Sequence, residues 1–283
     1  MLHLTVISIY LFTLIALGVY KSVTIKTQAD FAVAGRSLTP WVLVGTMLAT
    51  WIGTGSILGN AGKTYEMGIA ALMLPLGGVF GIYLLTKIAG KVRAFEKFTV
   101  PEILGDRYGS EARILSVIAL VIAYMVIVSY QYNAGGAVLT TILTDANGEP
   151  LITAQTGTII AAVFIIAYTM LAGLVSVAYT DVGNGIIMTV SLMIAFPILW
   201  MKAGGWSGME VAFANMGHPE KMQFFGRYST MDIINFCLPS FLLVLGDANM
   251  YQRFFASKDA EGAKKATTYL VVFVLIIELL IIS

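Results

Sequence analysis

The sequence predicts an all-α, polytopic membrane protein, and two observations support this fold class. Of the 283 residues, 58% are hydrophobic and only 12% are charged, and the mean hydropathy is +0.85. Soluble domains contain about 45–50% apolar and about 25% charged residues. The second observation is that the apolar residues gather into stretches of roughly 20, the length of helix that crosses a bilayer.

We expect eight transmembrane helices. The first apolar stretch resembles a signal peptide in position only, because its positive charges follow the run and no small-residue cleavage site is present. It is therefore predicted to be a retained span. The eight predicted spans cover about 2–20, 39–60, 66–90, 112–143, 156–176, 182–203, 232–253 and 266–283.

The positive charges predict the orientation of these spans. If the N-terminus lies outside, the inner segments hold 13 Lys and Arg residues and the outer segments hold 4. The excess belongs on the cytoplasmic side. The outer charges are Lys63, Lys202, Lys221 and Arg227. The sequence thus predicts a multi-pass protein of the plasma or inner membrane with its N-terminus outside.

Several function classes are disfavoured by composition. One cysteine, Cys237, excludes an internal disulfide and is too few for a cysteine metal site. His3 and His218 lie far from any cluster of carboxylates. No basic helix face suggests nucleic acid as a partner, and no cluster of nucleophiles, acids or metal ligands suggests an enzyme or an organic cofactor. The buried acids are isolated, and Glu278 is expected to pair with helices beyond the last residue.

The second span contains the stretch LATWIGTGSILGN (48–60), in which Gly53, Thr54, Gly55 and Ser56 weaken the helix. Unwound backbone at membrane depth is tolerated only where it faces protein or a water-filled cavity. The stretch therefore predicts a broken helix beside a cavity. The alternative is that these small residues let a neighbouring helix pack closely.

The seventh span carries a second interruption. Its sequence DIINFCLPSFLLVLGDANMYQRFF (232–255) contains Pro239 and then Gly246, Asp247 and Ala248 near its inner half. A carboxylate within a span usually faces the bundle interior or an aqueous path. The alternatives are that Asp247 is shallow and solvated, or that it pairs with Arg253.

The two interruptions lie five spans apart in helix order, in the second and seventh spans, and the two broken spans run in opposite directions. Such a pair is typical of inverted-repeat secondary transporters, in which broken helices meet near the midplane. Exposed carbonyls hold the coupling cation there, and helix dipoles hold the substrate.

Four motifs resemble those of the sodium:solute symporter family, in the same order along the chain. They are FAVAGRSLTPW (31–41), FTVPEILGDRYG (98–109), VAYTDVGNG (177–185) and ANMYQRFFASKDAEGAKKA (248–266). The resemblance implies the inverted-repeat fold of the leucine transporter, preceded by one extra helix. It implies the extra helix at 1–22, the first five-helix repeat at 39–203, and the opening two helices of the second repeat at 232–283. The other three helices of the second repeat would then be missing from this chain, which would make it a fragment of a longer carrier.

The resemblance also implies a sodium site. The backbone carbonyls of Ala49 and Ile52 match the family's sodium ligands before the first break, and Asp181 matches an acid on the inner sodium path. From the residues alone, Thr180 and Asp181 are equally well explained as the N-cap of the sixth span, which contributes about 1 kcal/mol. Sodium is the only ion that the resemblance implies.

Candidate solute contacts lie near the breaks and in the fourth span. Trp51, Ser56 and Pro75 occupy positions that are amides or carboxylates in the family's sugar carriers, so a sugar is disfavoured. Trp51, which resembles the choline carriers, and Asp247 would suit a cationic group through the ring face and the charge. Packing or membrane-interface aromatics explain Trp51 and the nearby tyrosines as simply. The predicted solute contacts are Trp51, Gly53, Ser56, Gln131, Asn133 and Asp247.

The predicted function is sodium-coupled symport of a small polar organic solute by alternating access. The solute is cationic, urea-like or otherwise small and polar. The alternatives are a sodium-independent carrier, and a channel or a receptor with many spans. The expected partners are the solute, sodium and the lipid bilayer.

Overall fold

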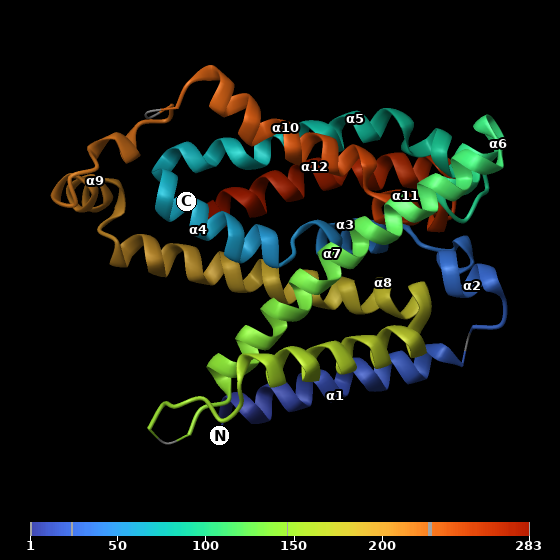
Figure 1. The fold of residues 1–283 in the computed structure, drawn as a ribbon, viewed down its shortest axis with the longest axis horizontal. Helices are drawn as coiled ribbons and strands as arrows, with labels where there is room; N and C mark the ends of the chain where they lie inside the picture. The colour runs from blue at the N-terminus through green and yellow to red at the C-terminus, as the bar shows by residue number, and fades with distance from the viewer. Residues whose placement is uncertain (1, 24, 146, 226–227, 283) are drawn as a thin grey trace. The chain divides into compact units, whose positions relative to one another are not determined.

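A computed structural model describes residues 2–23, 25–145, 147–225 and 228–282, and Figure 1 shows its ribbon. The chain divides into two compact units. The first unit comprises residues 1–37 and 97–180, and the second comprises residues 38–96 and 181–283. Arg227, one of the predicted outer charges, lies outside the described residues.

The first unit is helical. It contains α1 (Leu2–Ser22), α2 (Gln28–Val33), α6 (Val100–Tyr108), α7 (Ser110–Ile142) and the first part of α8 (Ala154–Lys202). Thr27 caps α2 in a reciprocal capping box with Asp30. Hydrogen bonds from the Thr27 side chain, and from the Lys26 and Thr27 N–H groups, hold the pKa of Asp30 below its ordinary value. α6 packs against α7, and Gly109 at φ 92° makes the turn between them.

The second unit contains both predicted breaks. Its central helices are α5 (Leu74–Ala94) and α12 (Ala260–Ile282), which lie side by side in Figure 1, with α10 (Thr230–Gly246) on α5 and α3 (Pro40–Trp51) on α12. The remaining pieces are short or mark bends in the chain. They are the π-helix η2 (Gly55–Gly59), α4 (Asn60–Met67), the 3₁₀ helix η3 (Gly68–Met73), α9 (Gly205–Asn215), η4 (Pro219–Met222) and α11 (Ala248–Ala256).

Each predicted span coincides with helix, but not all of these helices can cross a membrane by length and composition. Four can among the described residues, namely Gly55–Ala94, Ser110–Ile142, Gly173–Lys202 and Ala260–Ile282. The pair α10 and α11, bent by 40°, would be a fifth. Shorter apolar helices cover Thr5–Tyr20, Pro40–Trp51 and Ala154–Ala167. The short helices α6 and α9 lie between predicted spans.

The cap predicted for the sixth span is wrong. The helical stretch Ala154–Lys202 is interrupted at Gly173, which has φ 54° and ψ −179°. Only glycine adopts this conformation readily, so the interruption falls there and not at Thr180. Thr180 is helical, and its hydroxyl donates back to the carbonyls of Ser176 and Val177. Asp181 likewise lies inside the helix, which frees its carboxylate for another role.

Two of the family-like motifs are joined by backbone in the second unit. The Leu38 N–H donates to the Ala256 carbonyl at 3.1 Å, and the Lys258 N–H donates to the Leu38 carbonyl at 3.0 Å. The Arg93 Nε donates to the Ser257 carbonyl at 2.6 Å. The start of α3, the end of α5 and the α11–α12 corner are thereby fixed together. This anchor sets the position of α3 relative to α11.

Candidate functional site

In the first broken span, α3 ends at Trp51. Ile52, with φ −83° and ψ 85°, leaves the helical conformation, and the chain re-enters helix through the π-turn of η2 before α4 begins at Asn60. π-turns occur often at functional sites. The predicted break is therefore confirmed at Gly53 and includes Ile52, whereas Thr54, Gly55 and Ser56 are helical.

The break releases the carbonyl of Ala49 from the helical hydrogen-bond ladder. In a continuous helix the Gly53 N–H would donate to Ala49. Here it donates to the Trp51 carbonyl at 3.1 Å. The Ile52 carbonyl is also turned away from the helical direction, because its ψ of 85° replaces the helical value of about −42°. Both backbone oxygens thus lie outside the helical hydrogen-bond ladder.

The second broken span is interrupted at Asp247, as predicted. α10 ends at Gly246 and α11 begins at Ala248, with Asp247 extended at φ −72° and ψ 102°. The Asp247 carboxylate accepts a hydrogen bond from the Asn249 N–H at 3.0 Å and so caps α11. The aspartate cap thus lies at Asp247 and not at Asp181. The signal was present, because an acid directly before a helix is a favoured N-cap.

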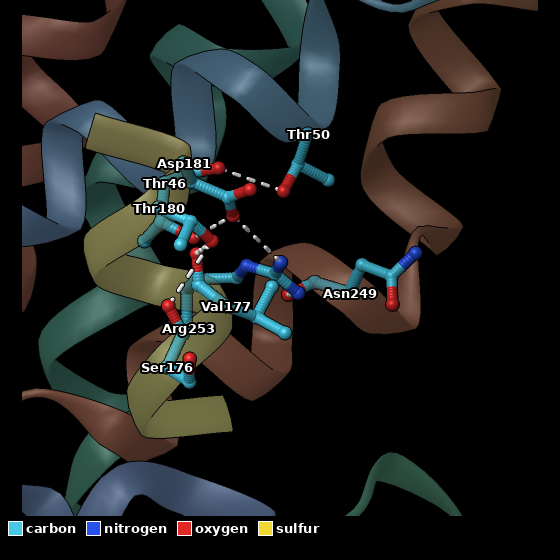
Figure 2. A network of polar contacts seen from close by, with 8 residues as sticks. All are labelled: Thr46, Thr50, Ser176, Val177, Thr180, Asp181, Asn249 and Arg253. Atoms are coloured by element: carbon cyan, nitrogen blue, oxygen red, sulfur yellow. Dashed lines mark hydrogen bonds and ion pairs between the residues drawn. The ribbon is translucent and has the colours of Figure 1, made fainter. Parts of the chain in front are cut away.

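A polar network joins α3, α8 and α11 one turn before the first break (Figure 2). The Thr46 hydroxyl donates to the Asp181 carboxylate at 2.6 Å, and Arg253 Nη2 lies 3.7 Å from the same oxygen. The Thr50 hydroxyl donates to the Thr46 carbonyl at 2.7 Å, and Arg253 Nη1 donates to the Asn249 carbonyl at 3.4 Å. Thr46 is fully buried, and the Asp181 and Arg253 side chains are 18% and 8% exposed. The network therefore ties both broken spans to Asp181.

Gly45 allows this network to form. A Cβ at Gly45 would lie 2.7 Å from Val182 Cγ2 and 3.2 Å from Val182 Cα. Because the neighbour includes backbone, α3 and α8 approach this closely only when position 45 has no side chain.

We expect Gly45→Ala to lower the free energy of unfolding by about 1–3 kcal/mol, because the helices must separate. Gly62→Ala in α4 is the matched control, since a Cβ there meets nothing within 4 Å. Alanine is the better helix former, so the control should be neutral or slightly stabilising. Thermal unfolding in detergent measures both. Equal shifts in the two variants would contradict the close approach.

Most of the chain matches a known protein family. A model of the sodium:solute symporter family matches residues 31–283, which include both breaks and the Asp181 network. The chain belongs to the sodium:solute symporter family. The resemblance of the four motifs is thereby confirmed.

Relatives of this chain come from animals and bacteria. "High-affinity choline transporter 1" of Drosophila melanogaster is 28% identical over 278 residues, 92% of this chain and 41% of the relative. "Solute carrier family 5 member 4" of Rattus norvegicus is 30% identical over 231 residues, 75% of this chain and 31% of the relative. "Sodium/proline symporter" of Staphylococcus aureus (strain JH9) is 24% identical over 240 residues, 81% of this chain and 45% of the relative. The chain thus spans less than half the length of each.

A solved structure shares the fold. It is described as the substrate-bound outward-open state of a sodium-coupled sialic acid symporter with a novel sodium site. The TM-score is 0.81 at 18% identity, over 100% of this chain and 59% of the other. The match extends over the whole of this multi-pass membrane chain.

Glu278 is a site residue whose partners the sequence analysis missed. We expected it to pair outside this chain, but its carboxylate accepts hydrogen bonds from Trp51 Nε1 at 3.1 Å and from Asn60 Nδ2 at 2.8 Å. Trp51, predicted as a solute contact, therefore has its polar atom engaged by α12. The Ser56 hydroxyl donates to the Trp51 carbonyl at 3.3 Å and also reaches Glu278. No sequence pattern pairs residues 227 positions apart.

The two solute candidates of the fourth span belong to the other unit. Gln131 is half-buried and Asn133 is exposed, and both lie on α7. The Thr158 hydroxyl lies 3.5 Å from Asn133 Oδ1 within the first unit. Within the described part of the chain, no group of three or more His, Cys, Asp or Glu side chains could hold a metal ion.

Proposed function

We propose that this chain forms part of a carrier that couples sodium entry to the uptake of a small polar organic solute. The observation that supports this most is the first broken span, where the carbonyls of Ala49 and Ile52 leave the helical ladder. Carbonyls freed in this way coordinate sodium in inverted-repeat transporters without burying a full charge.

Asp181 contributes a second element to the proposed sodium route. Its carboxylate is held by Thr46, on the same helix as Ala49, and by Arg253 beyond the second break. An ion that approaches this carboxylate competes with the Arg253 guanidinium. Sodium passage and the tie between the two broken spans are therefore coupled in this proposal.

The proposed layout follows the family resemblance. It has eight spans, of which the first is the extra helix. The five-helix repeat follows at 39–203, and the second repeat begins at 232–283. The distribution of Lys and Arg supports an N-terminus outside the cell and a location in the plasma or inner membrane.

The proposed solute carries a polar or cationic group near Asp247 and avoids the dense hydrogen bonding that a sugar needs. Relatives named for choline and for proline transport are consistent with a compact solute that bears a quaternary or secondary ammonium. Gly53, Ser56, Gln131 and Asn133 are the further contacts proposed here. Trp51 remains a proposed solute contact, but only through the face of its ring, because its indole N–H donates to Glu278.

Uptake into proteoliposomes tests the proposal. With an inward sodium gradient, accumulation of radiolabelled choline or proline above the external concentration is expected, and the signal should disappear when sodium is equal on both sides. Uptake that is indifferent to sodium would support a sodium-independent carrier. Flux far above carrier rates would support a channel, and binding without flux would support a receptor.

A further inference from the structure

Glu278 bridges the two sides of the first break. It lies in the apolar helix α12, and only 2% of its surface is exposed. One carboxylate oxygen accepts from Trp51, the last residue of α3, and the other accepts from Asn60, the first residue of α4. The two half-helices are therefore held to each other through a single side chain.

This carboxylate has no counter-charge within the described residues. No Lys, Arg or His nitrogen there lies within 4.0 Å of it, and its partners, Trp51, Asn60 and Ser56, are neutral. An ionised carboxylate buried in a membrane protein is costly unless another charge balances it.

The elements packed against α12 carry their ionisable groups elsewhere. α3, η2 and η3 contain none. Lys63 and Glu66 of α4 pair with each other at 2.7 Å and are exposed, as is Tyr65. The start of α12, beside Gly90, lies about 27 Å from Glu278 along the helix. The groups of α5 and α11 lie toward that end, and they are Tyr83, Lys87, Lys91, Arg93, Tyr251 and Arg253.

Either a sodium ion or a proton could neutralise the Glu278 carboxylate, and its hydrogen-bond donors favour the proton. Sodium requires several oxygen atoms around it, but both carboxylate oxygens face N–H hydrogens. A proton needs no cavity, and it binds a lone pair that those donors leave free.

We propose that Glu278 is a proton-binding site that controls how firmly the two halves of the first broken span are held together. The proton comes from water and forms one O–H bond on the carboxylate, and no electrons are transferred. Hydrogen bonds to an ionised acceptor are roughly twice as strong as bonds to a neutral one. Protonation therefore weakens the bonds from Trp51 and Asn60 and loosens the break.

Infrared difference spectroscopy on the purified protein in lipid tests this proposal, with acidification as the probe. Every Asp and Glu contributes to the carboxylic-acid C=O band that grows as the pH falls, and one component of this band, that of Glu278, should be missing in Glu278→Gln. Glu261→Gln is the matched control on the same helix, because Glu261 is exposed and pairs with Lys265. Its spectrum should keep the Glu278 band.

Trp51→Phe provides a second variant that keeps the acid. Losing one donor to the ionised form should move the midpoint of the band to higher pH by about one unit or more. Deuterium exchange at residues 52–60, corrected for intrinsic rates, should rise on acidification in the wild type and not in Glu278→Gln.

Two results would overturn the proposal. One is an acid band that loses no component in Glu278→Gln, or a Glu278 component that does not move in Trp51→Phe. The other is a band that sodium abolishes at constant pH in proportion to its concentration, which would make sodium the ligand. Neither measurement requires transport, so failure here is distinct from failure of sodium-coupled uptake.

Discussion

Asp181→Ala is expected to lower the free energy of unfolding by about 3 kcal/mol, because it leaves the buried Arg253 guanidinium without its carboxylate. Removing one partner of a buried ion pair is more costly than removing both, since the remaining charge stays desolvated. The Thr46 hydroxyl also loses its acceptor at 2.6 Å. Chemical denaturation in mixed micelles measures the effect.

Arg253→Met and the double variant show whether the charges are coupled. The double variant should lose less than the sum of the two single losses, by about 1–3 kcal/mol. Thr46→Val keeps the ion pair and should cost less than Asp181→Ala. Additive losses would show that the 3.7 Å separation of Asp181 and Arg253 carries no useful attraction.

The sodium dependence of stability separates the two roles proposed for Asp181. Stabilisation by a ligand follows its concentration relative to its dissociation constant. If Asp181 lies on the sodium route, Asp181→Asn should weaken the rise in melting temperature with added sodium chloride relative to potassium chloride. If it only holds Arg253, the melting temperature should fall at every sodium concentration by the same amount.

Asp247→Asn is expected to reduce uptake of a cationic solute about 10- to 100-fold and to spare a neutral solute. A hydrogen bond or ion contact to a charged group contributes about 1.5–3 kcal/mol, which corresponds to that range in affinity. The variant is well suited to the question, because asparagine caps a helix about as well as aspartate. The α11 cap from position 247 to Asn249 should therefore persist.

Asp247→Ala is the companion variant, since it removes the charge and the cap together. It should add a stability loss of about 1 kcal/mol to the transport defect. Competition between choline and an uncharged analogue of similar size, measured in proteoliposomes, gives the ratio of cationic to neutral solute uptake. An unchanged ratio in Asp247→Asn would remove Asp247 from solute recognition.

Several features were predicted from local sequence and are confirmed. The breaks near Gly53 and Asp247 follow from small residues or an acid placed inside an apolar run. The four motifs predict membership of the family, and the match to the family over residues 31–283 confirms it. The interruption at Gly173 was missed, because a single glycine in an apolar helix does not reveal that its φ will be positive.

The sequence by itself determined the class of protein, the positions of the apolar helices and the two weakened spans, since these depend on the chemistry of neighbouring residues. Tertiary structure decided which side chains hydrogen-bond to the buried acids. Asp181 meets Thr46 across 135 positions, and Glu278 meets Trp51 across 227. Helical periodicity reports which face of a helix is apolar, but the partner of a buried acid depends on how distant helices pack, and that packing requires close approach at residues such as Gly45.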